Sequence, residues 1–439
     1  MSIVARNTVE LQPNSLSLTG ERQLHRVSPL RRNGLLTNVV APVLSQPQSA
    51  SGLVFAVLRQ RGPIARDAIA QAAGLSTATV NRQVSALLDA QLLRERPDLA
   101  VPGLVGRPRV PLQLDHEPYL TLGVHIGART TSIVATDLLG RTLDAVETPT
   151  PSGTPGTVLT GLVERVQRYA GRWRRRRALW VGVAIGGVVD GVTGVVDHPR
   201  LGWSQIPLGP ALGRALGLPV SVASHVDAMA AAELLVGRRA GSDEINSLYL
   251  YARETVGLAQ IVNGQVHTPR GGPGTIARFP VSSEILGGRG ELESTVTDAA
   301  VLAAARNMGL LPESGPGSAM VDLLGIARSQ DATNSASARE LFAERARVLA
   351  GTAALLADML NPQSVVVGGQ AFTDYPEATA LLRATFTQRS VLASSEIRVS
   401  RFGGRVQEAA AGIVSLSSIY ADPAAVLSRV TGRRRTLSA

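Results

Sequence analysis

The residues at positions 122–137, LGVHIGARTTSIVATD, have the pattern of a loop that could hold a phosphate group. Two alternating apolar runs flank a tight Gly-Ala-Arg-Thr turn, which predicts a β-hairpin whose glycine allows the backbone to approach a ligand closely. His125 stands where such a loop normally carries an acid. The hairpin is therefore either a phosphoryl-transfer site with an unusual residue or the remnant of one that now has another use.

A more specific signal lies upstream at residues 74–93, GLSTATVNRQVSALLDAQLL. A short helix over 65–74, a turn at Gly74 and a helix capped by Ser76 predict a helix-turn-helix. The later helix has one apolar stripe, and its other side carries hydroxyl, amide and guanidinium groups that suit phosphates and base edges in the major groove. The predicted DNA contacts of this helix are Ser76, Thr77, Thr79, Asn81, Arg82 and Gln83. The alternative is a three-helix packing module with a polar outer surface.

Two further segments are rich in arginine. In GRPR, residues 106–109, proline favours an extended backbone, so that Arg107 and Arg109 could lie along a narrow minor groove. Because GRPR directly follows the predicted winged helix, we interpret it as a DNA contact rather than an ordinary linker turn. The run RWRRRR at residues 172–177 lies between a predicted helix and a buried strand, and we interpret it as a solvated loop.

The composition favours a polyanionic partner. The chain has 439 residues and a formal charge of +10, and phosphates release counterions when arginine side chains replace them. The alternative is a GC-rich genome that prefers arginine codons, because the chain contains no lysine. The chain has no cysteine, which excludes disulfides and thiolate metal sites. No apolar run is long enough to cross a bilayer and the N-terminus has no apolar signal core, so we expect a cytoplasmic protein without a membrane partner.

The chain is expected to be an α/β protein with an N-terminal winged helix-turn-helix followed by two α/β lobes. Its expected parts are a disordered or partly ordered arm (1–48), the winged helix-turn-helix with its GRPR linker (49–115), a first lobe (116–245), a second lobe with C-terminal helices (246–425) and a basic tail (426–439).

The order of these motifs, from the winged helix through GRPRVPLQLD to VGVAIGGVVDGVTGVVDHPRLGWSQIPLG, resembles the ROK family of repressors, open reading frames and sugar kinases. The resemblance is to the repressor branch, which includes the xylose and N-acetylglucosamine repressors, and it covers roughly residues 51–420. It implies an actin/hexokinase-like pair of lobes with sugar and ATP sites in the cleft between them.

The resemblance also implies that the phosphate-binding loops have changed. His125 occupies the position of the aspartate that helps to hold magnesium-bound phosphate, and Arg129 replaces a small residue in the same turn. The companion loop of the second lobe, normally Gly-Thr-Gly-like, reads ARETVG, so Arg253 and Glu254 bring bulk and negative charge to it. Affinity for nucleotide phosphates is expected to be weak.

The sugar and zinc positions of the family are altered as well. Ser224 replaces the sugar-binding asparagine, His225 replaces the aspartate that deprotonates the sugar hydroxyl, and Asp227 falls at a second asparagine. Thr275 stands for the glutamate that grips the sugar, while Glu293 is a retained sugar-facing acid. The zinc ligands are replaced by Arg278, Glu284, Leu286 and Glu291. We therefore expect no catalytic residue, no bound metal and no cofactor.

We expect a sequence-specific DNA-binding transcription regulator, of the repressor branch, whose body no longer acts as an enzyme. Its partners would be double-stranded DNA, further copies of itself in a dimer or tetramer, and a sugar-like or anionic effector. The effector cleft would be formed by Ser224, His225, Asp227, Thr275, Arg278 and Glu293. Two alternatives stay open: a ROK-type sugar kinase with altered catalytic residues, and a protein-binding scaffold whose role would survive deletion of residues 1–115.

Overall fold

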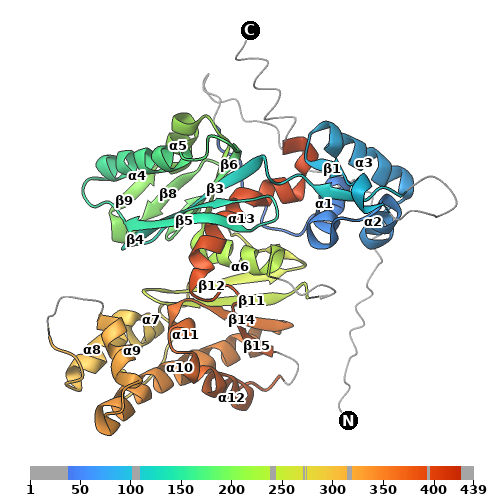
Figure 1. Ribbon diagram of the computed structural model, residues 1–439. Coiled ribbons are helices and arrows are strands. Elements are labelled where there is room, and N and C mark those ends of the chain that lie inside the picture. The colour runs from blue at the N-terminus through green and yellow to red at the C-terminus, as the bar shows by residue number, and fades with distance from the viewer. Residues whose placement is uncertain are drawn as a thin grey trace, which may run out of the picture. The chain divides into compact units, whose positions relative to one another are not determined.

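The computed structural model describes residues 38–100, 109–237, 244–269, 272, 274–313, 319–392 and 396–426. They form a three-helix head and two α/β lobes, which Figure 1 shows in blue, in teal to green and in yellow to orange. The predicted fold class is thereby confirmed. Within these ranges, no helix combines the length and the apolar character that a bilayer-spanning segment needs.

The head consists of three helices and a small antiparallel sheet. Its elements are α1 (Ala50–Arg61), α2 (Arg66–Ala73), α3 (Thr77–Asp89), β1 (Leu93–Glu95), the 3-10 turn η1 (Pro97–Leu99) and β2 (Leu112–Leu114). Gly74 separates α2 from α3 at φ 64°, a left-handed conformation that favours glycine. The side chains buried in its core include Phe55, Leu58, Ile69, Val80, Val84 and Leu87. Each such burial contributes about 1.5–3 kcal/mol to folding.

Lobe 1 is built on a five-stranded sheet in the order β10-β6-β3-β4-β5. Its strands are β3 (Tyr119–Ile126), β4 (Thr130–Thr136), β5 (Thr142–Pro149), β6 (Arg177–Ile185) and β10 (Val220–Ser224), and its helices are α4 (Pro155–Ala170), α5 (Leu208–Leu216), α6 (His225–Leu235) and α13 (Val406–Ala421). A smaller sheet contains β7 (Val188–Asp190), β8 (Val195–His198) and β9 (Trp203–Ile206), with the 3-10 turn η2 (Pro199–Leu201) before β9.

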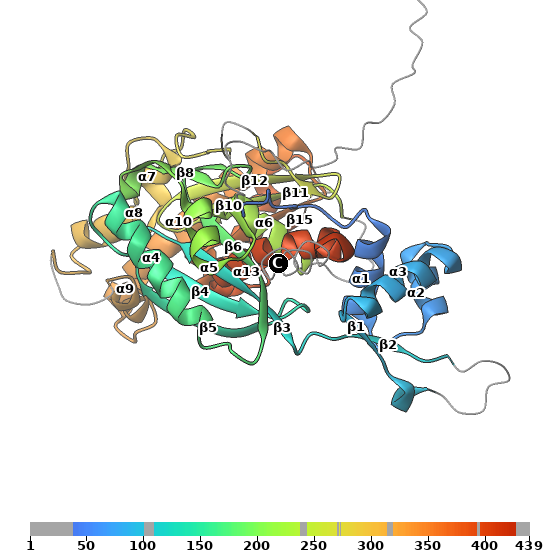
Figure 2. The same ribbon diagram turned by 90° about the horizontal axis from the view of Figure 1, so that it is seen from above.

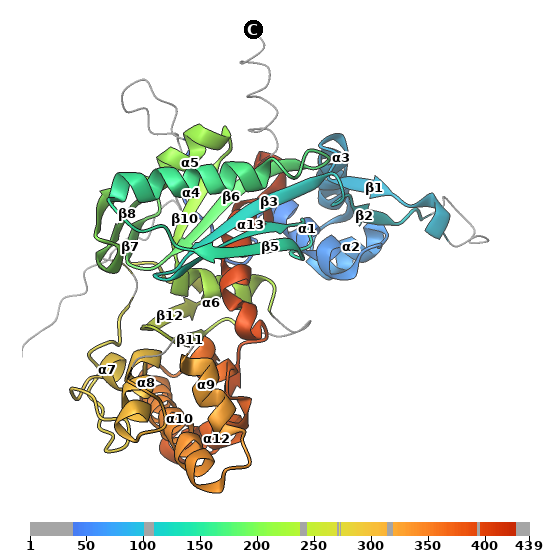
Figure 3. The same cartoon turned by 60° about the vertical axis from the view of Figure 1, so that its left-hand side comes forward.

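The two faces of the main sheet of lobe 1 are covered differently. Figure 3 shows α4 and α5 above the sheet and α6 below it. The face below also receives α13, whose backbone approaches the strands closely at two glycines. A Cβ atom at Gly123 would lie 2.6 Å from the carbonyl carbon of Ala411, and one at Gly182 would lie 2.1 Å from the nitrogen of Ser415. Only glycine therefore fits at these two strand positions.

Lobe 2 repeats this sheet. Its strands are β11 (Ser247–Ala252), β12 (Val256–Val262), β13 (Gln265–Val266), β14 (Ser364–Gly368) and β15 (Glu396–Val399). Its helical elements are α7 (Leu292–Val296), α8 (Asp298–Asn307), α9 (Ala319–Ala327), α10 (Ala332–Leu360), α11 (Gln370–Thr373), η3 (Pro376–Ala378), α12 (Thr379–Arg389) and η4 (Gly403–Arg405). When the strands of each sheet are numbered 1 to 5 along the chain, both sheets have the order 5-4-1-2-3 from one edge to the other. The shared order supports an ancient duplication of the lobes.

Helix α6 lies between the two sheets. It contacts α13 and β10 on the side of lobe 1, and β11 and β12 on the side of lobe 2. Every residue from Val226 to Leu235 is buried, as is expected for a helix that is packed on all sides.

The residues just before the head contact both lobes. The backbone of Val220 in β10 pairs with Asn38 and Val40 through two hydrogen bonds of 2.8 Å. Further along, Gln46 donates its backbone N–H to Gly264, and Val266 donates to Leu44, both at 2.9 Å. The described part of the predicted arm is thus an ordered segment along the edges of both sheets.

Candidate functional site

Helix α3 presents a polar surface outward. Val80, Val84 and Leu87 are buried in the head, whereas Asn81 and Arg82 are exposed. Of the other predicted DNA contacts, Ser76 and Thr77 are exposed, and Thr79 and Gln83 are half-buried. The Ser76 hydroxyl caps the helix, because it accepts from the Thr79 backbone N–H at 3.2 Å and donates to the Thr79 hydroxyl at 2.9 Å. This leaves Asn81 and Arg82 as the more available side chains on the outer face.

The structure describes only Arg109 of the GRPR motif. Arg107 lies outside the described residues. The side chain of Arg109 is 69% exposed and forms an ion pair of 2.8 Å with Asp67 at the start of α2. An exposed pair of this kind is worth less than about 1 kcal/mol, so a phosphate could replace Asp67 as its partner.

The start of α1 in the head is hydrogen-bonded to the C-terminal end of α13. The Ser49 hydroxyl donates to the carbonyl oxygen of Ala421 at 2.6 Å, and the Ser51 hydroxyl donates to the Asp422 carboxylate at 2.7 Å. Figure 2 shows α1 beside the end of α13. A Cβ at Gly52 would lie 2.5 Å from the carbonyl oxygen of Ala421, so the two segments meet at backbone distance.

An aromatic contact strengthens this junction. The ring of Phe55 in α1 lies 6.0 Å from the ring of Tyr420 in α13. Arg59 places its guanidinium carbon 4.5 Å from the centre of the Tyr420 ring and also donates to the carbonyl oxygen of Leu235 in α6 at 2.7 Å. Helix α1 therefore contacts the last turn of α13, which packs on the sheet of lobe 1, and the end of α6, which lies between the two sheets.

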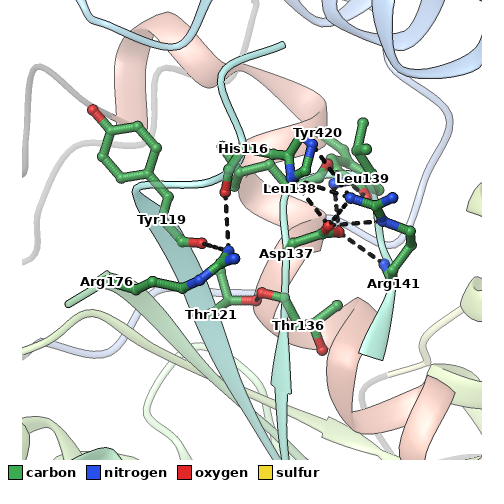
Figure 4. A network of polar contacts seen from close by, with 10 residues as sticks. All are labelled: His116, Tyr119, Thr121, Thr136, Asp137, Leu138, Leu139, Arg141, Arg176 and Tyr420. Atoms are coloured by element: carbon green, nitrogen blue, oxygen red, sulfur yellow. Dashed lines mark hydrogen bonds and ion pairs between the residues drawn. The ribbon is translucent and has the colours of Figure 1, made fainter. Parts of the chain in front are cut away.

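A buried carboxylate organises the turn beneath the junction (Figure 4). Asp137 is fully buried and accepts the backbone N–H groups of Leu139 and Arg141, each at 3.0 Å. The Arg141 guanidinium forms an ion pair with the same carboxylate at 2.7 Å, and His116 lies 3.3 Å from it. Burial lowers the pKa of His116, although the negative charge of Asp137 opposes this change. The Tyr420 hydroxyl closes the group by donating to the carbonyl oxygen of Leu138 at 3.2 Å.

The second candidate site is a cavity of about 500 Å³ between the lobes, large enough for a small metabolite. Four of the six residues predicted for an effector cleft lie in its wall: Ser224, His225, Thr275 and Glu293. Asp227 is buried two residues after His225 in α6 and is not in the wall, and Arg278 is exposed away from it.

Imidazole rings form the floor of this cavity. His125 and His225 are stacked with their ring centres 5.9 Å apart, and His198 also lines the cavity. Burial lowers the pKa of His125 to about 3 and that of His225 to about 4, so both rings are neutral at pH 7. Among the described residues, the buried His125 Nε2 and Ser224 Oγ have no hydrogen-bond partner. Both residues line the cavity, so its wall contains two polar atoms without a partner in the described protein.

Two ion pairs cross the cavity from one lobe to the other. Arg129, in the hairpin that we expected to bind phosphate, pairs with Glu254 of the opposite hairpin at 3.1 Å. Arg200 pairs with Glu293 at 2.8 Å and donates to the carbonyl oxygen of Glu254 at 3.0 Å. The two predicted phosphate loops therefore bind each other, and the acid expected to face a sugar is held by an arginine.

Sequence reasoning missed His198 and Arg200 in this site. Both belong to the segment DHPR at residues 197–200, whose histidine and arginine were a visible but nonspecific signal. Within the described ranges, no three histidine, aspartate or glutamate side chains are grouped in a way that could hold a metal ion.

Comparisons with known proteins agree on one family. A sequence model described as the ROK family matches residues 121–414. A transcriptional regulator of Mycobacterium tuberculosis is 61% identical over 399 residues, which are 89% of this chain and 90% of that protein. The DNA-binding transcriptional dual regulator NagC of Escherichia coli is 26% identical over 335 residues, covering 74% of this chain and 80% of NagC.

Solved structures share the fold. A ROK family transcriptional regulator described as a homologue of the Escherichia coli Mlc protein has a TM-score of 0.70 and 22% identity, covering 87% of this chain and 98% of that one. A ROK family glucokinase from Streptomyces griseus, in complex with glucose and AMPPNP, has a TM-score of 0.56 and 23% identity, covering 67% of this chain and 99% of the other.

Proposed function

The chain belongs to the ROK family, and we propose that it is a DNA-binding transcriptional regulator whose head reads DNA and whose body no longer phosphorylates sugar. The observation that carries the proposal is the exposed polar face of α3 on a head that is fastened to a ROK body. The names of the relatives in Mycobacterium tuberculosis and Escherichia coli support the same function. A protein with this task works in the cytoplasm, where the chromosome lies.

The outer face of α3 enters the major groove. Asn81 and Arg82 are exposed polar residues of this face, and the exposed Thr77 precedes Asn81 by one turn. Arg107 and Arg109, which precede β2 in the chain, follow the minor groove. The protein binds as a dimer or tetramer, so its target consists of half-sites separated by whole helical turns, about 10 bp or a multiple.

Substitution of Arg82 by alanine is expected to weaken binding to the DNA upstream of the protein's own gene by about tenfold, because a bidentate contact to a base is worth about 1–3 kcal/mol. Electrophoretic mobility shift at several salt concentrations measures this. The matched control is Arg383→Ala, an exposed arginine of α12 in lobe 2, which should leave the affinity unchanged. Failure of the intact protein to bind any promoter-proximal fragment at low salt would rule out the proposal.

The cleft does not carry out phosphoryl transfer. That reaction needs a metal clamp and backbone groups that cradle the phosphates. Here His125 replaces the expected acid, and the Arg129–Glu254 pair joins the two loops that would have to receive the nucleotide. The neutral His225 has no acidic partner beside it, among the described residues, to fix it as a base.

We expect no ADP release above the enzyme-free rate when the protein is incubated with magnesium-ATP and glucose or N-acetylglucosamine. A coupled assay measures this, with the Streptomyces griseus glucokinase as the positive control. Turnover that disappears in His225→Ala would instead identify a kinase with altered catalytic residues.

The cleft binds an effector in place of a substrate. The free His125 Nε2 and Ser224 Oγ, together with Thr275 at the edge, support a sugar-like or anionic ligand. Both glutamates of the wall, Glu254 and Glu293, are already paired with arginines. Their negative charges are therefore neutralised and do not oppose the binding of an anion. A thermal-shift screen of sugars and sugar phosphates identifies the compound.

A further inference from the structure

The arginine-rich segment that follows α4 is the strongest local concentration of charge in the chain. Six arginines lie between positions 168 and 177, and no acidic residue occurs between Glu164 and Asp190. The sequence alone predicts a solvated loop far from the head.

The fold places this segment at the junction with the head. β6 pairs in parallel with β3, and Arg177 lies opposite Tyr119, so the loop before β6 sits at the end of the sheet where β3 begins. The Arg176 guanidinium lies 3.4 Å from the carbonyl oxygens of both His116 and Tyr119 (Figure 4). His116 is two residues beyond β2, the last strand of the head.

Contacts occur on both sides of this loop. Arg172 forms an ion pair with Asp144 at 3.3 Å and lies over the ring of Tyr169. The backbone N–H of Arg176 donates to the carbonyl oxygen of Trp173 at 3.0 Å and closes a tight turn.

Arg174 and Arg175 are the two central residues of that turn. Both are exposed, and the described part of the chain offers neither of them a hydrogen bond or an ion pair. Two unpaired guanidinium groups on one turn concentrate positive charge that no acidic side chain of the described residues neutralises, and such groups suit the phosphates of a polyanion.

The distance to the head allows this turn to reach the DNA that the head binds. Only residues 115–118 separate β2 from β3. Four residues span at most about 14 Å, whereas one turn of B-DNA extends about 34 Å. The turn therefore lies nearer to the end of the head than the length of one helical turn of DNA, so a duplex that leaves the head along this side of the body would meet it.

We infer that Arg174 and Arg175 bind phosphates of the DNA that flanks the half-site, as a second contact supplied by the body. The inference rests on the proposed DNA-binding function. The loop then contacts only the sugar-phosphate backbone of the DNA. Such contacts add affinity and salt dependence, but they do not distinguish one base sequence from another.

The test uses the full chain and two duplexes that contain its binding site, which is first mapped by footprinting. One duplex ends at the limits of the site, and the other extends by about one helical turn, ~10 bp, on each side. Binding is measured by fluorescence anisotropy for the wild type, for Arg174→Glu/Arg175→Glu and for the control Arg383→Glu. We expect the double variant to lose about tenfold in affinity for the extended duplex, with a shallower salt dependence, and to bind the short duplex like the wild type.

Each other outcome overturns the inference in a distinct way. If the double variant binds the extended duplex like the wild type, the loop is not a DNA contact, and the proposed function stands. If Arg383→Glu loses as much affinity as the double variant, the effect is one of net charge alone. If the wild type binds neither duplex, the inference and the proposed function fall together.

Discussion

Replacing Asp137 by alanine is expected to lower the free energy of unfolding by about 3 kcal/mol. The carboxylate is fully buried and accepts two backbone N–H groups as well as the Arg141 guanidinium. Each buried donor left without a partner costs about 1–3 kcal/mol. Asp137→Asn keeps an oxygen for the N–H groups and loses only the charge, so its loss should be smaller. Urea unfolding followed by circular dichroism measures both.

The control for this prediction is Glu377→Gln. Glu377 pairs with Arg328 at 2.9 Å, but both side chains are 47% exposed. An exposed pair contributes less than about 1 kcal/mol. If Asp137→Ala is no more destabilising than this control, the carboxylate does not organise the turn beneath the head.

Replacing Asp227 by asparagine is expected to stabilise the protein by about 2–4 kcal/mol at pH 8, because a pKa difference of 1 between the folded and unfolded states corresponds to about 1.4 kcal/mol. Asp227 is only 4% exposed, and burial raises its pKa from 3.8 to about 7. Between about pH 4 and pH 7 the folded state keeps a proton that the unfolded chain has released, so the contribution of Asp227 to stability falls as the pH rises through this window. Above pH 7, the folded protein carries the full cost of a buried charge.

Asparagine has the shape of the protonated acid and does not ionise. The difference between Asp227→Asn and the wild type should therefore be small at pH 4 and reach its full size near pH 8. Urea unfolding at the two pH values measures it, with Asp322→Asn at an exposed position of α9 as the control. Equal unfolding free energies of Asp227→Asn and the wild type at pH 8 would contradict the prediction.

Much of the head and the family assignment could be predicted from the sequence. The turn at Gly74, the cap at Ser76 and the apolar spacing of Val80, Val84 and Leu87 are local signals, and the structure places α3 accordingly. The order of motifs along the chain was enough to predict the ROK family, which the comparisons confirm, and a regulator, which is also what the relative in Mycobacterium tuberculosis is named. The individual DNA contacts stay predictions, since they depend on a duplex.

Which charged side chains pair with each other could be seen only in the tertiary structure. Glu293 was expected to face a sugar, yet it pairs with Arg200, 93 residues away in the chain. Arg176 reaches His116 across 60 residues and brings a loop that looked remote next to the head.

By itself, the sequence determined the helices of the head, the two α/β lobes and the family, because capping and apolar periodicity act over a few residues. Which charges pair, which face the cleft and which remain free was decided by the order of strands in the two sheets. That order brings residues together through the packing of whole elements, and no local pattern encodes it.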